Sequence, residues 1–279
     1  MPTIAFVTDR VRPLGVSDDH LVLPALAALG VAVVFVPWED ARPRPDVAAW
    51  VVRSPWNYAT ALSPFLETLA PLAPLHNAFD LVRWNSDKRY LFELAEAGAP
   101  IVPSVVAPRD ALAAIAESTG FAELVVKPLV SAGGSNTRRV RAENLDDEDI
   151  FAGLPEGEYL VQPFLDDVLA GGEVSCVFFE GAFSHAVRKR PQAGNFLVQE
   201  EHGGSTVAVD VSAELIAASE DVLTAAPAVG LYARVDWIET RRGPRLVELE
   251  LIEPELYLRA HPQAPARFAA AILRRLEQG

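Results

Sequence analysis

The alternation of apolar and polar positions divides the first part of the chain into short strands and helices. Short apolar runs are typical of strands, and the stretch that ends at Gly30 has the spacing of a helix. Pro64 marks the start of a second helix. The expected strands are residues 3–8, 31–37 and 46–53, and the expected helices are residues 18–30 and about 63–70. Strands that alternate with helices predict a small parallel sheet.

The pattern changes near residue 84. A polar cap there begins a helical pattern that stops at Gly98, within residues 84–100, and later segments alternate as antiparallel strands do. The expected strands are residues 123–128, 158–165, 173–181, 182–189, 231–240 and 245–252, with helices at about 213–226 and 265–277 and a loop at 190–206. We therefore predict an α/β domain at residues 1–84, a mixed α+β part at residues 85–190 and a closing part at residues 191–279.

Composition narrows the class of protein. The chain has 279 residues, of which 50% are hydrophobic, and a formal charge of −14, which argues against nucleic acid or an anionic membrane as the main partner. A local cluster of Lys and Arg still allows a small anionic ligand. The single cysteine, Cys176, fits a reducing compartment and the core of the protein. The N-terminus lacks the pattern of a signal peptide, and no apolar run could span a bilayer, so we expect a cytoplasmic protein.

Four glutamates interrupt an apolar stretch, LVELELIEPEL, at residues 246–256. Glu248 and Glu250 are two residues apart, so an extended chain places both on one face, where they repel each other. If the turn of the hairpin centres near Arg242, Asp236 lies opposite Glu248. Such oxygen ligands suit Mg²⁺ or Mn²⁺, whereas the five scattered histidines do not form a zinc site.

The alternative is a solvated strand face on which Arg234 and Arg245 neutralise the glutamates. The leucines around the glutamates favour a strand that is apolar on most sides, and therefore favour the metal site.

Two lysines add a second chemical signal. Lys127 ends an apolar strand just before a glycine-rich turn at residues 131–136, and Lys88 lies at the start of a helix. Each alone is better interpreted as a surface charge. Together, two lysines, a loop whose N–H groups can surround phosphate oxygens and a carboxylate trio fit a nucleoside triphosphate bound with Mg²⁺. The turn is not a P-loop, because no Gly-Lys-Ser/Thr follows the glycines.

In this order of motifs the sequence resembles the ATP-grasp superfamily over about residues 85–277. The motifs are Lys88, VVKP with its glycine-rich loop, LVQPFL, GGE, AVRKRP, RVDWI and VELEL. The phrases RSPWNY, RWNSDKRYL, HAVRKRP and ELELIEPELYL are similar to the cyclo-ligase family of cycloserine biosynthesis, and GNFLVQEEHGG is more distantly similar to glutathione synthetase and to ribosomal-protein glutamate ligases. The resemblance implies an α/β and α+β protein, with an ATP-grasp fold after an N-terminal Rossmann-like domain.

The resemblance also implies roles for individual residues. Those implied to bind ATP are Lys88, Lys127, Gly133, Gly134 and Ser135 at the phosphates, Gln162, Pro163, Phe164 and Leu165 at adenine, and Glu173 at the ribose. Those implied to bind metal are Asp236, Glu248 and Glu250. Glu250 stands where the superfamily usually has Asn, which leaves the number and identity of the metals open. Leu197 replaces an arginine of the ribosomal-protein ligases, which argues against glutamate extension.

Catalytic and substrate residues are expected nearby. Arg234 shares a strand face with Asp236 and could hold the transferred phosphoryl group, assisted by Lys189 or Arg188. The candidates for substrate binding follow a strand end, where α/β proteins tend to bind ligands; they are Arg53, Trp56, Asn57 and Tyr58. Arg53 could clamp a carboxylate, but a loop anchored by packed aromatic rings explains this segment equally well.

We expect an ATP-dependent carboxylate–amine ligase that acts through an acyl phosphate on a small amino-acid-like substrate, with cyclisation left open. Its partners would be a small-molecule acid and an amine. A small-molecule kinase and a non-catalytic nucleotide-binding protein remain as alternatives. The sequence leaves the oligomeric state open, a homodimer included.

Overall fold

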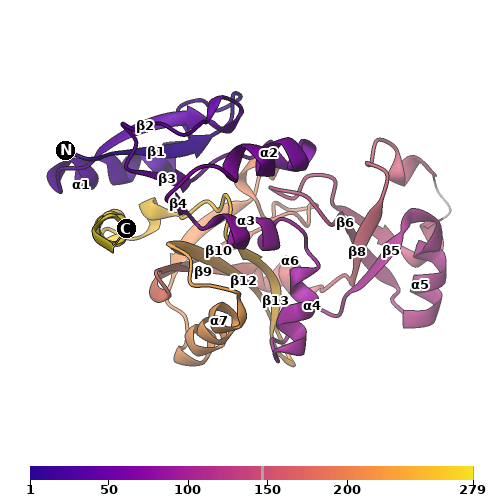
Figure 1. Cartoon of the computed structure of the whole chain (residues 1–279). Coiled ribbons are helices and arrows are strands. Elements are labelled where there is room, and N and C mark those ends of the chain that lie inside the picture. The colour runs from indigo at the N-terminus through magenta and orange to yellow at the C-terminus, as the bar shows by residue number, and fades with distance from the viewer. Residues whose placement is uncertain (146–147, 279) are drawn as a thin grey trace.

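Three sheets organise the protein, for which a computed structural model describes residues 1–145 and 148–278 (Figure 1). The first sheet is parallel, as predicted, and its strand order is β2-β1-β3-β4. Its strands are β1 (Thr3–Thr8), β2 (Ala32–Pro37), β3 (Ala49–Val52) and β4 (Leu75–His76). Its helices are η1 (Ser17–Val22), α1 (Leu23–Ala28), η2 (Trp38–Asp40), η3 (Tyr58–Thr60) and α2 (Leu62–Leu69). The helix expected at residues 18–30 is split, because Pro24 has no N–H to continue a helix and instead starts α1.

The second sheet is antiparallel, in the order β5-β8-β6-β7. Its strands are β5 (Val105–Pro108), β6 (Glu123–Pro128), β7 (Arg138–Arg141) and β8 (Glu158–Pro163). Helix α5 (Leu112–Thr119) packs on it, and the short helices beside it are η4 (Arg109–Ala111), η5 (Ala142–Asn144) and η6 (Glu148–Phe151). Strand β7 escaped prediction because three of its four residues are arginines, two of which contact Glu123 of the neighbouring strand.

The third sheet is antiparallel, in the order β11-β10-β9-β12-β13. Its strands are β9 (Glu173–Phe179), β10 (Ala182–Arg190), β11 (Ser205–Val209), β12 (Tyr232–Thr240) and β13 (Gly243–Glu250). Helices α4 (Tyr90–Glu96) and α7 (Ala213–Ala225) share an apolar core with one face of this sheet. The sheet includes strands on both sides of residue 190, and the three-part division of the chain stays a prediction.

The helix expected within residues 84–100 also differs. Helix α3 (Phe79–Asn85) ends before α4 begins, and Lys88 lies in the turn between them. The remaining short helices are α6 (Asp167–Gly171), η7 (Glu200–His202) and η8 (Leu258–Ala260). Within the described residues, no helix combines the length and the apolar character needed to cross a bilayer.

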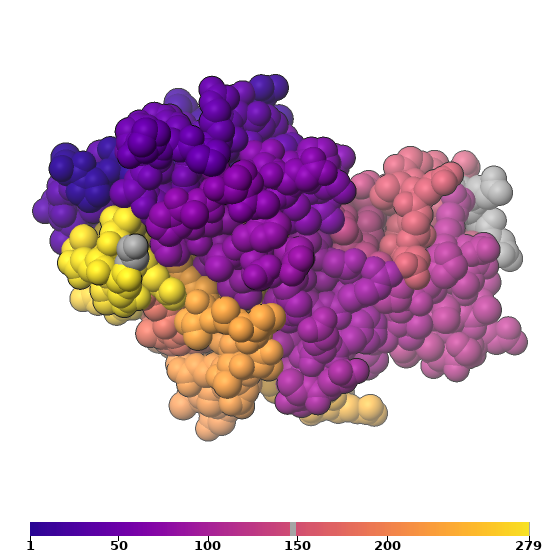
Figure 2. Space-filling model, viewed as in Figure 1, coloured from indigo at the N-terminus to yellow at the C-terminus, as the bar shows by residue number. Residues whose placement is uncertain are grey.

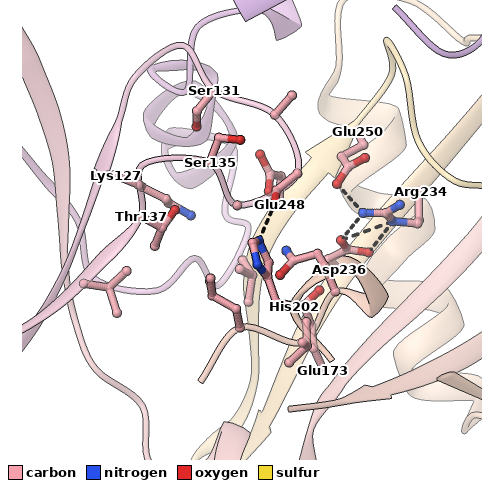
Figure 3. Close-up of a pocket in the computed structure, with 18 of the residues that line it drawn as sticks. Lys127, Ser131, Ser135, Thr137, Glu173, His202, Arg234, Asp236, Glu248 and Glu250 are labelled. Atoms are coloured by element: carbon pink, nitrogen blue, oxygen red, sulfur yellow. Dashed lines mark hydrogen bonds and ion pairs between the residues drawn. The ribbon is translucent and has the colours of Figure 1, made fainter. Parts of the chain in front are cut away.

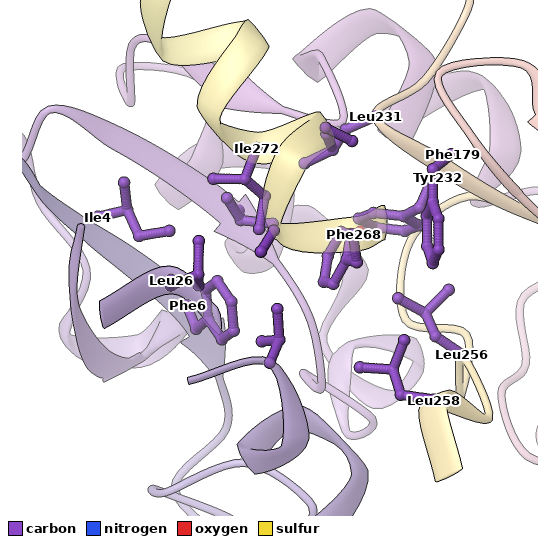
Figure 4. Close-up of a cluster of buried hydrophobic side chains, with 14 of the residues drawn as sticks. Ile4, Phe6, Leu26, Phe179, Leu231, Tyr232, Leu256, Leu258, Phe268 and Ile272 are labelled. Atoms are coloured by element: carbon purple, nitrogen blue, oxygen red, sulfur yellow. The ribbon is translucent and has the colours of Figure 1, made fainter. Parts of the chain in front are cut away.

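The last helix, α8 (Ala264–Gln278), covers the first sheet. Phe268 and Ile272 of α8 share one buried cluster with Ile4, Phe6 and residues of β9 and β12 (Figure 4). In the space-filling view the C-terminal helix lies against the N-terminal segment (Figure 2). The two ends of the chain thus meet in one core that joins the first sheet to the third.

Candidate active site

The acidic strand pairs as the sequence predicts. In the hairpin of β12 and β13, Asp236 lies opposite Glu248 and Arg234 lies opposite Glu250. A one-residue bulge follows, because the next residue, Trp237, pairs with Leu246, so that Val247 has no partner on β12. The bulge shifts the alternation, so that Leu246 packs in the core while Glu248 and Glu250 line a pocket.

The outer edge of β13 is held by groups from other elements. Asn85 Nδ2 donates to Leu249 O (2.8 Å), and its Oδ1 accepts from Leu251 N (2.8 Å). The Leu249 N–H donates to the Tyr90 hydroxyl (3.0 Å), and Leu246 N donates to the carbonyl of residue 100 (2.9 Å). An edge strand whose backbone groups are bonded on both sides has a fixed register, which fixes the positions of Glu248 and Glu250.

Asp236 is the centre of a buried charge network. Its carboxylate accepts hydrogen bonds from Arg234 Nη2 (2.9 Å), Lys189 Nζ (3.1 Å) and Ser175 Oγ (2.6 Å). Burial opposes ionisation, but Arg234 and Lys189 hold the pKa of Asp236 below its ordinary value. Lys189 also contacts Glu173. Burial lowers the pKa of Lys189, yet Asp236 and Glu173 outweigh it, and the net result is a raised pKa.

The two glutamates of β13 have their own cations. Glu248 Oε1 lies 3.0 Å from Lys88 Nζ, and burial is outweighed by Lys88 and Lys127, which lower the pKa of Glu248. Glu250 contacts Arg234, but burial, together with Asp236 and Glu248, raises the pKa of Glu250 to about 7. Burial also lowers the pKa of Lys127.

These pairs explain how the protein tolerates so many carboxylates: cations of the same site neutralise them. Among the described residues, no group of three His, Cys, Asp or Glu side chains converges as a ready metal site.

Two loops meet above the pocket. Gly133 and Gly134, in the loop between β6 and β7, have φ angles of 59° and 72°, which side chains other than glycine rarely adopt. His202, from the loop that the sequence places at residues 190–206, shares a hydrogen bond of 3.3 Å between its Nε2 and the carbonyl of Gly133. Figure 3 shows Lys127 and Thr137 across the pocket from Arg234 and Asp236, with His202 between the two sides.

The second half of the pocket is apolar. The Arg139 guanidinium lies 3.7 Å from the Phe164 ring centroid, and Phe196 meets that ring edge-on at 6.1 Å. The Phe164 N–H is already donated to Glu123 O (2.9 Å). The apolar side chains that line this half of the pocket and were not assigned from the sequence are Val102, Val125, Val168, Ile238 and Val247. Two of them could have been found, because Val125 and Ile238 lie two residues from the predicted site residues Lys127 and Asp236, on the same strand face.

The pocket has a volume of about 450 Å³ and collects most of the predicted residues. Those that line it are Trp56, Asn57, Tyr58, Lys88, Lys127, Gly133, Gly134, Ser135, Gln162, Pro163, Phe164, Leu165, Glu173, Arg234, Asp236, Glu248 and Glu250. Arg12, Ser131, His202, Glu253, Glu255 and Tyr257 also line it and were not assigned from the sequence. Most of these lie in loops, where no strand or helix periodicity indicates the direction of a side chain.

Three predicted residues lie elsewhere. Arg188 donates to Gly171 O (2.8 Å) and Glu239 (2.7 Å), because neighbouring residues of β10 face opposite sides of the sheet and Lys189 takes the inner side. This contradicts the prediction that Arg188 assists phosphoryl transfer. Lys189 lies beneath the pocket, on Asp236 and Glu173, and does not line it.

Arg53 is the third predicted residue outside the pocket. Its buried guanidinium donates to Asp19 (2.9 Å) and Pro254 O (3.1 Å) and lies 5.0 Å from the ring centroid of Tyr232. These contacts contradict the expectation that Arg53 clamps a substrate, because they tie the first sheet to the C-terminal part. The Asn57 amide is likewise engaged, with Trp38 Nε1 (2.7 Å) and Glu39 (2.8 Å).

Comparison with known proteins identifies the family of the chain. Residues 4–77 match the family model of the D-cycloserine synthetase DcsG N-terminal domain. The chain is 32% identical to the cycloserine biosynthesis protein DcsG of Streptomyces lavendulae over an alignment of 306 residues, which covers 99% of this chain and 100% of that one.

Solved structures agree as well. The crystal structure of D-cycloserine synthetase DcsG has a TM-score of 0.87 and 27% sequence identity, over 98% of this chain and 99% of that one. The RimK domain protein ATP-grasp from Sphaerobacter thermophilus DSM 20745 has a TM-score of 0.73 at 20% identity, over 97% and 99%, and has the same fold. With its full-length similarity and its charged pocket between two loops, this chain belongs to the ATP-grasp ligase family that includes DcsG.

Proposed function

We propose that this ATP-grasp ligase uses ATP to activate a carboxylate, or a similar oxygen, of a small amino-acid-like substrate through an acyl phosphate. A nitrogen nucleophile then displaces the phosphate and forms a carbon–nitrogen bond. The observation that carries this proposal is the single pocket in which Lys88, Lys127 and Arg234 meet Glu248 and Glu250. Lys88 and Arg234 can exchange their carboxylate partners for phosphate oxygens, and Lys127, which makes no ion pair within residues 1–145 and 148–278, can bind them directly.

Each end of the pocket suits one part of the nucleotide. Lys88 and Lys127 supply positive charge beside the glycine-rich loop, where phosphates would bind. Phe164 and the apolar walls suit a purine ring, which packs well on aromatic and aliphatic groups. Glu173 lines the pocket and would accept the ribose hydroxyls.

The carboxylates fit a divalent cation. Glu248 and Glu250 have side-chain exposures of 26% and 22% and supply the hard oxygen donors that Mg²⁺ or Mn²⁺ prefers. Asp236 would join them as Arg234 turns toward a phosphoryl group. When bound, the ion neutralises phosphate charge. The protein's part is to release Lys88 and Arg234 from these carboxylates toward phosphate oxygens.

The chemistry needs no side-chain nucleophile. A carboxylate is a poor electrophile because its leaving group would be oxide, whereas an acyl phosphate loses phosphate readily. Positioning and charge neutralisation by Lys127 and Arg234 therefore supply most of the catalysis. Cys176 is an unsuitable nucleophile, because burial raises the pKa of its thiol to about 12.

The similarity to DcsG supports a finer version of the reaction, in which the attacking nitrogen belongs to the activated molecule and a ring closes. A cytoplasmic location and the oligomeric state stay predictions.

Hydroxylamine trapping tests the proposal. We expect the protein, with ATP, Mg²⁺ and a panel of D- and L-amino acids, to form ADP and an amino acid hydroxamate. Glu248→Gln should abolish both, because it weakens metal binding and leaves Lys88 without its partner, while Glu96→Gln, on the exposed end of α4, should change neither. A stable phosphorylated product that hydroxylamine does not intercept would instead identify a kinase. ATP binding without ADP formation would identify a non-catalytic protein.

A further inference from the structure

Trp56 joins two oppositely charged residues that both line the pocket. The guanidinium of Arg12 lies over its ring, 4.5 Å from the centroid. The indole Nε1–H donates to the backbone carbonyl of Glu253 (3.2 Å). Arg12 comes from the loop after β1 and Glu253 from the segment after β13, so Trp56 connects the N-terminal and C-terminal walls of the pocket.

Buried Asp9 fixes the N-terminal wall. Its carboxylate accepts from the backbone N–H of Arg12 (2.7 Å) and of Asn57 (3.2 Å), which ties the loop after β1 to the loop after β3. The Arg12 Nη1 contacts Asp9 only at 3.4 Å, and in the described part of the chain its Nη2 has no acceptor. Arg12 therefore holds its guanidinium over Trp56 with donors to spare, unlike Arg234, whose guanidinium contacts both Asp236 and Glu250.

Glu253 lacks a positively charged partner in the described part of the chain. The other buried or half-buried carboxylates of the pocket each contact a cation; they are Glu173, Asp236, Glu248, Glu250 and Glu255. Across residues 1–145 and 148–278, the half-buried carboxylate of Glu253 makes neither a hydrogen bond nor an ion pair. A partly desolvated carboxylate without a partner is costly, and a cationic ligand would relieve that cost.

We propose that Arg12 and Glu253 bind the two charged groups of a zwitterionic amino acid. The substrate's ammonium pairs with Glu253, its carboxylate or another anionic oxygen pairs with Arg12, and its aliphatic atoms pack on Trp56. This assignment rests on the proposed ligase function and deepens it, because it names the residues that would select the two charges of the substrate. A molecule that lacks either charge leaves one half-buried group unpaired, so the site should reject such analogues.

Binding and kinetics test the subsite separately from the reaction. Isothermal titration calorimetry on the full chain with saturating ADP and Mg²⁺ would use D-serine and D-cycloserine, which are zwitterions, and N-acetyl-D-serine and D-serine methyl ester, which each lack one charge. The same amino acids would be assayed for ATP-dependent ADP release. The variants are Arg12→Gln and Glu253→Gln. The controls are Arg10→Gln, from the same loop but paired with exposed Asp40, and Glu96→Gln.

We expect each variant to weaken zwitterion binding, and to raise the amino acid KM, by about tenfold to a hundredfold, while the KM for ATP changes less than twofold. Glu253→Gln should also lose discrimination against the N-acetyl analogue, and Arg12→Gln against the ester. Unchanged ADP affinity establishes that the variants are folded. The subsite is refuted if the wild type binds neither zwitterion, or if both variants keep the wild-type affinity and discrimination. Selective binding without ADP formation would instead retain the subsite and refute the ligase reaction.

Discussion

Replacement of Lys189 by methionine tests the charge network beneath the pocket. The Lys189 side chain is 1% exposed, and its Nζ lies 3.1 Å from Asp236 and also contacts Glu173. Methionine keeps a similar length and an apolar stem, so the substitution removes the charge with little change in packing. Asp236 retains Arg234 in the variant, whereas Glu173 loses the cation that it contacts.

The expected loss of stability follows from this difference between Asp236, which keeps a cation, and Glu173, which does not. Removing one partner of a buried ion pair typically costs about 3–5 kcal/mol, because the other charge stays buried without compensation. Lys189→Met should lower the free energy of unfolding by about this amount at pH 8. In the double variant with Glu173→Gln, the uncompensated charge disappears, and more than half of the lost stability should return.

Urea unfolding at pH 8 and pH 5 measures both effects. Burial raises the pKa of Glu173, and the charge of Lys189 opposes this rise. Without Lys189 the pKa of Glu173 should be higher still, so Glu173 in the variant takes up a proton more readily. A folded-state pKa above the unfolded value means that stability is lost as the pH rises. The cost of Lys189→Met should therefore be smaller at pH 5 than at pH 8. A loss below about 1 kcal/mol at pH 8, or no recovery in the double variant, would refute this account of the network.

Three further predictions address the backbone, pH and the nucleotide. Gly172→Ala should destabilise the protein by more than about 1 kcal/mol in urea unfolding, because its φ is 75° and a Cβ would lie 2.2 Å from Lys189 O; Gly171→Ala, with open space around it, should be nearly neutral. Burial lowers the pKa of His185 to about 4, below its unfolded value, so the free energy of unfolding should fall by about 2 kcal/mol between pH 7 and pH 5. The variant His185→Gln should lack this fall. If its free energy of unfolding decreased as much as that of the wild type over this pH range, the role of His185 would be contradicted. Phe164→Ala should raise the Kd for ATP by about tenfold in calorimetry without raising the KM for the amino acid, and an equal rise in both would argue against a role at the base.

The register of the acidic hairpin shows what a sequence pattern can establish. The pairing of Asp236 with Glu248 followed from counting residues around a turn, and the structure has that pairing. The count succeeded although the true turn lies half a residue earlier, because the extra residue of the bulge, Val247, restores the register. Neither the bulge nor its effect on Leu246 could be predicted, because both depend on how the core packs against α4 and α7.

Other parts of the site depended on information that a linear pattern does not contain. Strand alternation requires Arg188 and Lys189 to face opposite ways, but it does not say which of them faces inward. Arg53 follows a strand end as ligand-binding residues do, yet the partner that occupies it, Asp19, comes from a distant short helix. Arg12 and Glu253 lie in loops, and only the tertiary contact of each with Trp56 brings them to the same pocket.

The packing of α8 on the first sheet has a consequence for the nascent chain. A ribosome releases Ile4 and Phe6 long before it makes Phe268 and Ile272, the residues that cover them. Throughout translation, the first sheet therefore presents an apolar surface that no earlier segment can shield completely. Chaperones and proteases would encounter this surface until α8 has emerged, so termination before α8 should yield a polypeptide that is degraded rather than a smaller working domain.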